Sequence, residues 1–378
     1  MNFAWSEEQN ELKRTVIEFC RSKLPPVPDA GPEAFSREAW LLCARHGVLG
    51  IAAPARFGGL DKDALTSALV TEALGYACAD LGLVFAMAAH VYACIVPLVK
   101  FGSEAQRDRW LTKLVAGDAI AAHATTEPNA GSDIFHMTTR AERRGDHYAL
   151  TGIKCFTSNA PVADVFIVQA VTDPSKGYFG LSSFAVEKGT AGLRVGKPYD
   201  KLGLRSAPMA DVYLDECLVP AAHRIGSEGA GASVFLHSMT WERTCLLAAY
   251  VGAMERVLER TIDYAKERTQ FGQPIGKFQG VSHRIADMKL RLESARLLMY
   301  RAAWSIAEGT DDELSASLAK LAVSEAAVAS ALDAIQVHGA IGTTSGEIER
   351  FLRDSIPARV FSGTSEIQRN TIARALGL

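Results

Sequence analysis

The sequence predicts an α+β protein in which helices are followed by a block of strands and then by helices again. Before residue 120 apolar residues recur at helical spacing, from 120 to about 225 short runs are rich in Thr, Val and Tyr, and from about 230 long helical patterns return. A chain of 378 residues is long enough for two or three domains. We expect an N-terminal helical domain at 1–119, a middle β domain at 120–227 and a C-terminal four-helix bundle at 228–378.

The first expected helix begins with a capping box, in which Ser6 and Gln9 hydrogen-bond to each other's backbone amides. Leu12, Val16 and Phe19 then share one face, as in an amphipathic helix. Further helical patterns of the first domain lie at 38–47, 63–78 and 104–116.

The middle block alternates β-branched or aromatic residues with polar ones and is divided by Gly, Pro, Asn and Asp. Its clearest runs are HYALTGIKCFTSNA, VFIVQAV, SSFAVE and DVYLDE. Such runs favour antiparallel strands in a small barrel or sandwich. Beyond them, Ile285, Met288 and Leu292 step at helical spacing, and 312–337 is Ala-rich with few breakers, which is typical of a helical bundle.

Composition excludes several classes of protein. The net charge of −3 and the pI near 6.3 give no concentrated positive field for nucleic acid. Seven cysteines are scattered singly, which favours buried thiols in a reducing cytoplasm, and no metal-ligand spacing is present. The apolar stretch 81–98 is interrupted by His90, Tyr92 and Pro97, so we expect buried helices of a soluble protein; a membrane span needs roughly 20 apolar residues.

Five short segments carry residue types suited to a nucleotide cofactor. They are TTEPNAGSD (125–133), KCFTSNA (154–160), ERTQFGQPIGKFQ (267–279), QVHGAIG (336–342) and FSGTSEIQR (361–369). The first offers backbone N–H groups and hydroxyls, the second an aromatic ring beside hydroxyls, and the third an arginine fork for a pyrophosphate. The last two are Gly-bearing turns that permit close backbone approach. Taken alone, the first segment is better explained as an ordinary polar turn. The second could be an edge strand with a core phenylalanine, and the third a joint between two helices.

Together and in this order, the segments resemble the acyl-CoA dehydrogenase family over essentially the whole chain. The resemblance implies an antiparallel β-barrel middle domain, a homotetramer, and FAD bound between the β domain and the bundle. It implies that a neighbouring subunit completes the site through Arg268, Gln270, Phe271 and Gln279. The remaining cofactor contacts it implies are Thr126, Ser132, Phe156, Ser158, Gln336, Gly339, Thr364 and Glu366.

The resemblance also implies a carboxylate that removes the proton beside a thioester carbonyl, while FAD accepts a hydride from the next carbon. Much of the family carries this Glu directly before the GT of the last motif, where this sequence has Ser362. A subset similar to isovaleryl-CoA dehydrogenases carries it on the first bundle helix before an Arg, which matches Glu242 and Arg243. We predict Glu242 as the catalytic base, with Arg243 and Ser362 in contact with substrate. The alternative for Glu242 is a first-turn residue or an ion-pair partner of Arg243.

The segments SMTWERTCLLAA and VSHRIADMKLRLESARLL resemble a narrower group, the prolyl carrier-protein dehydrogenases of antibiotic and other secondary-metabolite biosynthesis. That resemblance implies L-proline held by phosphopantetheine on an acyl or peptidyl carrier protein and oxidised toward a pyrroline or pyrrole. The resemblance also implies an electron acceptor, either an electron-transfer flavoprotein or O₂. Three alternatives stay open: a short- or branched-chain acyl-CoA dehydrogenase, a flavin acyl-thioester oxidase, and a non-catalytic family member.

An acidic carrier protein would need a basic docking surface. The candidates for it are Arg284, Lys289, Arg291 and Arg296 on one bundle helix, and Arg140, Arg143 and Arg144 in a loop of the β domain. Charged runs on helices are more often simply solvated.

Overall fold

The computed structural model describes residues 4–25, 35–310 and 313–378, and residue 312 of the predicted Ala-rich helix lies outside them. The N-terminal helices are α1 (Glu7–Lys23), α2 (Arg37–Arg45), α3 (Ala64–Ala77), α4 (Leu81–His90), α5 (Val96–Phe101) and α6 (Glu104–Val115). The predicted capping box of Ser6 and Gln9 is confirmed, since each side chain accepts the other's backbone N–H.

The most apolar stretch forms one continuous helical run, in which α4 passes through the π-helical turn Val91–Ile95 into α5. By length and composition this run could cross a membrane, but 89% of its apolar window is buried inside the protein. It is therefore a core element.

The middle domain is an eight-stranded sheet in the order β6–β7–β3–β2–β4–β5–β8, with β1 beside β4. The strands are β1 (Ala121–Ala124), β2 (Arg140–Arg144), β3 (His147–Ser158), β4 (Val165–Val171), β5 (Leu181–Glu187), β6 (Leu193–Val195), β7 (Met209–Pro220) and β8 (Arg224–Ile225). The predicted antiparallel pairing holds except at β4, which pairs in parallel with β1 and, at one residue, with β2. The long connection from β1 to β4 allows this, because parallel neighbours need a crossover.

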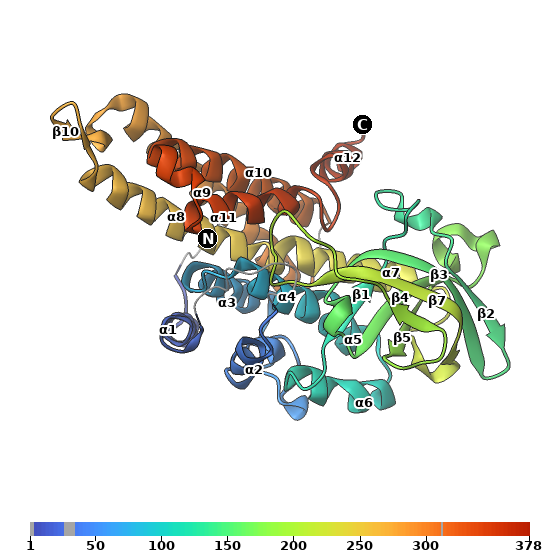
Figure 1. Cartoon of the computed structure of the whole chain (residues 1–378). Coiled ribbons are helices and arrows are strands. Elements are labelled where there is room, and N and C mark those ends of the chain that lie inside the picture. The colour runs from blue at the N-terminus through green and yellow to red at the C-terminus, as the bar shows by residue number, and fades with distance from the viewer. Residues whose placement is uncertain (1–3, 26–34, 311–312) are drawn as a thin grey trace.

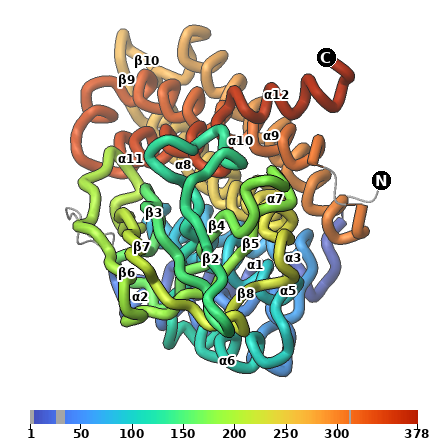
Figure 2. Tube along the Cα trace, turned by 90° about the vertical axis from the view of Figure 1, so that its right-hand side faces the viewer, coloured from blue at the N-terminus to red at the C-terminus, as the bar shows by residue number. Residues whose placement is uncertain are grey.

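The C-terminal helices are α7 (Gly231–Trp241), α8 (Ala248–Glu267), α9 (Gln279–Ala307), α10 (Glu313–His338), α11 (Glu347–Ser355) and α12 (Ser365–Ala375). A short hairpin of β9 (Thr269–Gln270) and β10 (Gln273–Pro274) joins α8 to α9. Figure 1 places this hairpin at one end of the bundle and the β domain at the other. Figure 2, viewed toward the sheet, shows the β domain in front of both sets of helices.

The two helical domains share one hydrophobic core, which includes Phe19, Trp40 and Tyr250. Helices α3 and α8 approach so closely that a Cβ added at Gly75 would lie 1.9 Å from the carbonyl oxygen of Ala249. Only glycine fits such a contact. The N-terminal domain therefore fixes the position of the bundle helix that follows the predicted base.

Candidate active site

Glu242 begins a π-helical turn, Glu242–Leu246, between α7 and α8, and all five of its residues are buried. Its carboxylate accepts a 2.5 Å hydrogen bond from the hydroxyl of Ser362, while Nε of Arg243 donates to the carbonyl oxygen of Ser362 at 3.1 Å. Isolated π-helical turns occur frequently at functional sites. Here the turn directs two consecutive charged side chains to the same partner.

The segment that carries Ser362 is held in a strained but well-supported conformation. Ser362 has φ 53° and Gly363 has φ 88°, both in the left-handed region. The amide of Gln368 donates to the carbonyl oxygens of Ser362 and Gly363 at 3.3 and 2.9 Å. Thr364 caps α12 by accepting the N–H of Ile367. These contacts point the hydroxyl of Ser362 toward the π-helical turn.

Arg243 is also buried and lies 3.6 Å from Glu313. Burial lowers the pKa of Arg243, and the carboxylates of Glu313 and Glu242 partly oppose that effect. A direct ion pair between Glu242 and Arg243 does not appear among the contacts of the described residues. The ion-pair alternative for Glu242 is therefore not supported, and its carboxylate faces Ser362 instead.

His123, which the sequence analysis missed, lies on β1 beside the predicted base. Its Nδ1 is 3.9 Å from Oε1 of Glu242, and its side chain is 10% exposed. Its Nε2 lies 3.5 Å from Nε2 of Gln169, whose Oε1 accepts a 2.8 Å hydrogen bond from Ser183. The only sequence signal was a polar ring in the otherwise alanine-rich strand AAHA.

The first two predicted cofactor segments are tied together by a buried ion pair. Nζ of Lys154 donates to Glu127 at 2.8 Å and to the carbonyl oxygen of Thr125 at 3.1 Å. Glu127 also accepts the backbone N–H groups of Thr138 and Thr139. Burial alone would raise the pKa of Glu127, but Lys154 and these donors outweigh it and lower the pKa to about 2. The loop at 125–133 is thereby fixed against β3.

The surface that these two segments form fits a flavin. Phe156 lies near the end of β3 with φ 53° and is 58% exposed, its ring stacked on Tyr199 at 5.2 Å. Buried hydroxyls usually find partners, but those of Thr125 and Thr157 have none among the described residues. An exposed ring beside unsatisfied hydroxyls suits a planar, polar-edged cofactor.

The other predicted cofactor residues divide into two groups, a near group close to the β domain and a far group at the opposite end of the bundle. Thr126 is joined to β3 through the N–H of Cys155. The near group also contains Ser132 on the loop before β2, Ser158 at the end of β3, and Thr364 and Glu366 at the start of α12. Ser158 and Thr364 are half-buried, whereas Ser132 and Glu366 are exposed.

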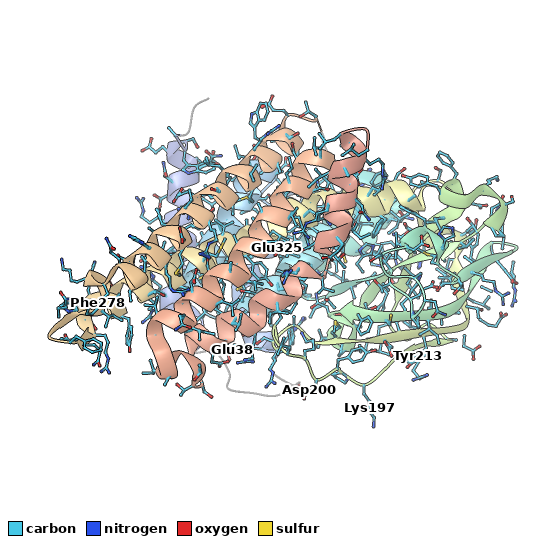
Figure 3. The ribbon with its side chains drawn as sticks, turned by 90° about the horizontal axis from the view of Figure 1, so that it is seen from above. Glu38, Lys197, Asp200, Tyr213, Phe278 and Glu325 are labelled. Carbon is cyan, nitrogen blue, oxygen red and sulfur yellow. The ribbon has the colours of Figure 1, made fainter. Side chains whose placement is uncertain are left out.

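The far group lies at the hairpin end of the bundle. Its members are Arg268, Gln270, Phe271, Gln279, Gln336 and Gly339, all exposed. The ring of Tyr264 near the end of α8 stacks on His338 at 4.5 Å, which brings the end of α10 to the hairpin. Figure 3 shows Phe278 of this end far from Tyr213 in the β domain. One chain therefore does not bring the two groups together.

The basic residues predicted for docking on α9 are engaged within the bundle. Arg284 and Arg291 both pair with Asp333, Lys289 pairs with Glu293, and Arg296 contacts Glu72, Glu255 and Glu293. The prediction that Arg140, Arg143 and Arg144 lie in a loop is wrong, because all three lie on strand β2, paired with β3. Arg140 and Arg144 lie near Glu142, and Arg143 lies over the ring of Tyr148. Paired arginines offer little free positive charge to a partner.

Three models of known domains match the chain in succession. The acyl-CoA dehydrogenase N-terminal domain matches residues 6–118, the middle domain 122–217 and the C-terminal domain 229–377. The chain belongs to the acyl-CoA dehydrogenase family. This membership confirms the predicted fold class, the enzyme class of acyl-thioester dehydrogenase and FAD as the cofactor.

Similar proteins include enzymes named for prolyl carrier proteins. The chain is 46% identical, over the full length of both proteins, to an L-prolyl-peptidyl-carrier-protein dehydrogenase of Pseudomonas fluorescens. The crystal structure of the prolyl acyl carrier protein oxidase AnaB superposes with a TM-score of 0.97 at 47% identity, covering 99% of this chain and 100% of that one. The structure of PigA with FAD and proline matches with a TM-score of 0.96 at 43% identity, covering 100% of both chains.

Proposed function

We propose that this acyl-CoA dehydrogenase family member oxidises the Cα–Cβ bond of an L-prolyl thioester held on the phosphopantetheine of a carrier protein. The observation that carries the proposal is the buried carboxylate of Glu242, held by the hydroxyl of Ser362 at the position where much of the family has its base. The full-length similarity to prolyl carrier-protein enzymes supports the substrate class.

Ser362 determines which oxygen of Glu242 is free to act. Its hydroxyl engages Oε2, whereas Oε1 accepts no hydrogen bond from the described residues. A general base needs an unoccupied oxygen within reach of the proton that it removes. We assign Oε1 as the atom that takes the α-proton of the thioester. FAD, when bound, would supply the acceptor for the hydride of the β-carbon.

The surroundings of Glu242 limit access of water. Tyr92 of the first π-helical turn stacks with Trp241 at 6.0 Å, and both flank the second π-helical turn. The rings of Phe85 and Phe361 meet at 4.9 Å on the side of Ser362. A base in such an apolar setting reacts with a bound substrate rather than exchanging its proton with solvent.

A continuous series of ring contacts leads from this site to the surface. His123 lies 6.1 Å from Phe235, Phe235 lies 6.3 Å from Phe135, Phe135 lies 5.1 Å from Tyr178, and Tyr178 lies 5.2 Å from Phe179. Phe179 is 69% exposed. We propose that the phosphopantetheine arm follows this series and that the carrier protein contacts the surface around Phe179.

A second copy of the chain completes the proposed FAD site, within a homotetramer. The far group at the hairpin end cannot reach the near group of the same chain (Figure 1). On α9, Leu290, Leu297 and Trp304 repeat every seven residues and are each more than half exposed. A heptad stripe of apolar residues is suited to packing against another helix. The stripe supports association of copies through the bundle.

The substrate assignment is tested with two thioesters of different carriers. We expect purified protein to bleach its flavin absorbance when mixed with L-prolyl carrier protein, and to react at least 100-fold more slowly with short- or branched-chain acyl-CoA, on the order expected when a polar group of the substrate is recognised. Preference for acyl-CoA would contradict the proposal. Peroxide formation during turnover would identify O₂ as acceptor in place of an electron-transfer flavoprotein. A colourless protein inactive with both would support the non-catalytic alternative.

The cellular setting follows from the proposed substrate. Enzymes that oxidise prolyl carrier proteins supply pyrroline or pyrrole units, so we propose a role in antibiotic or other secondary-metabolite biosynthesis in the cytoplasm. The seven cysteines agree with a reducing compartment, since all are buried and unpaired.

A further inference from the structure

We propose that His123 determines specificity for an aminoacyl thioester by donating a hydrogen bond from Nδ1 to the ring nitrogen of the substrate. The inference rests on the proposed function and concerns a residue with no role in the reaction described so far. It is carried by the position of a half-buried imidazole beside the free oxygen of Glu242 and by the contacts that orient it.

A chain of contacts across the sheet favours one tautomer of His123. The hydroxyl of Ser183 on β5 donates to Oε1 of Gln169 on β4, so the amide nitrogen of Gln169 faces β1. That nitrogen lies 3.5 Å from Nε2 of His123, which must therefore act as an acceptor. In a neutral imidazole the proton is then on Nδ1, which faces Glu242.

The Nδ1–H group of His123 is left without an acceptor at hydrogen-bond distance. Its nearest carboxylate oxygen, Oε1 of Glu242, is 3.9 Å away, and no other acceptor is found among the described residues. Once a bound substrate seals this donor from water, leaving it without a partner is costly. A substrate atom with a lone pair, placed between the imidazole and the carboxylate, would remove this cost.

The ring nitrogen of a neutral prolyl group provides such a lone pair next to the α-carbon. A protonated ring nitrogen would instead pair with Glu242 and occupy the oxygen that has to accept the α-proton. An imidazole N–H therefore selects the neutral amine and leaves the base free. A plain acyl chain presents a methylene group at this position, so His123 stays unsatisfied and the substrate is rejected.

The test compares two substrates on the same carrier protein: L-prolyl and cyclopentanecarbonyl, which replaces the ring N–H with a methylene group. We expect wild-type protein to prefer the prolyl thioester in kcat/KM by roughly 10²–10⁴-fold. His123→Leu should lose most of this preference through slower reaction of the prolyl substrate alone. Gln169→Leu, which removes the orienting amide, should lose part of it.

Binding provides a second readout that needs no turnover. In the Glu242→Gln background, calorimetry should show that His123→Leu weakens binding of the prolyl carrier protein and leaves binding of the cyclopentanecarbonyl carrier protein unchanged. A wild-type enzyme that does not distinguish the two carrier thioesters, or variants that keep the wild-type ratio, would overturn the role of His123 while leaving the proposed function intact. Oxidation of acyl-CoA with no reaction on either carrier thioester would overturn both.

Discussion

The hydroxyl of Ser362 donates a 2.5 Å hydrogen bond to Oε2 of Glu242, across 120 residues of sequence. Ser362 stands where much of the family has its catalytic carboxylate, and here it supports the carboxylate of Glu242, which comes from another element. Arg243 reinforces the same contact by donating to the carbonyl oxygen of Ser362. The site combines the proposed base from a π-helical turn with a support from the turn before α12.

Replacing Ser362 with Ala should slow the reaction without loss of cofactor. The variant frees Oε2 of Glu242 and removes the contact that fixes its rotamer, so we expect kcat to fall by roughly 10-fold, the effect of about 1.4 kcal/mol. KM and FAD content should remain near wild type. Steady-state kinetics and the flavin-to-protein absorbance ratio measure these quantities. An unchanged kcat would mean that Ser362 does not position the base.

Replacing Glu127 with Gln should weaken both folding and FAD retention. The change leaves the buried ammonium of Lys154 without its carboxylate, and breaking a buried ion pair costs roughly 3–5 kcal/mol. We expect a lower midpoint of urea unfolding near neutral pH and partial loss of FAD on gel filtration. The matched control is Glu142→Gln on exposed β2, which should behave as wild type.

The effect of Glu127→Gln should depend on pH in a defined direction. Because the folded pKa of Glu127 is lowered to about 2, its contribution to stability is present above its ordinary value and is lost as the pH falls toward about 2. The stability difference between wild type and variant should therefore shrink between about pH 5 and about pH 3. A difference that stays constant over this range would contradict the role of the ion pair.

Two inactive variants should restore activity when their subunits are mixed. Arg268→Ala removes a far-group residue, and Glu242→Gln removes the proposed base. If a site takes Glu242 from one chain and Arg268 from its neighbour, mixed assemblies contain some intact sites. Co-refolding or co-expression should give activity well above the sum of the separate variants. Strictly additive activity would show that each site uses residues of one chain only.

Replacing Phe179 with Asp should affect the carrier protein more than the reacting group. An acidic residue on the surface that we propose for carrier-protein contact repels an acidic carrier. We therefore expect KM for prolyl carrier protein to rise by roughly 10-fold, with little change for a free prolyl-pantetheine thioester. Leu218→Asp on β7 is the control, because Leu218 is also exposed but lies outside the series of ring contacts. Equal effects on both thioesters would place Phe179 in the site itself.

Much of the fold could be predicted because its signals are local. The capping box at Ser6 and the alternating strands depend on neighbours in sequence, and both were found. The π-helical turn at Glu242 was not predicted, since an inserted residue leaves the helical pattern on either side intact. The parallel pairing of β1 with β4 joins residues more than 40 positions apart, and no local pattern encodes it.

The candidate site was predicted only in part for a similar reason. The motifs that contain Thr126, Phe156 and Arg268 were recognisable as sets of residue types. Glu242 was recognisable too, because Ser362 replaces the usual carboxylate of the last motif. His123 and the pair of Glu127 with Lys154 were missed, because their importance lies in contacts between strands that only the folded chain creates.

The most direct test of Glu242 as the base is the rate of flavin reduction in a single turnover of Glu242→Gln with L-prolyl carrier protein. Glu259→Gln of α8 serves as the control. A glutamine keeps the shape of the side chain but cannot accept the α-proton. We predict that the Glu242 variant retains FAD and that its flavin is reduced on the order of 10³-fold more slowly than in wild type, whereas the control is unaffected. Reduction at a near-normal rate in a protein that holds FAD would show that another group removes the proton.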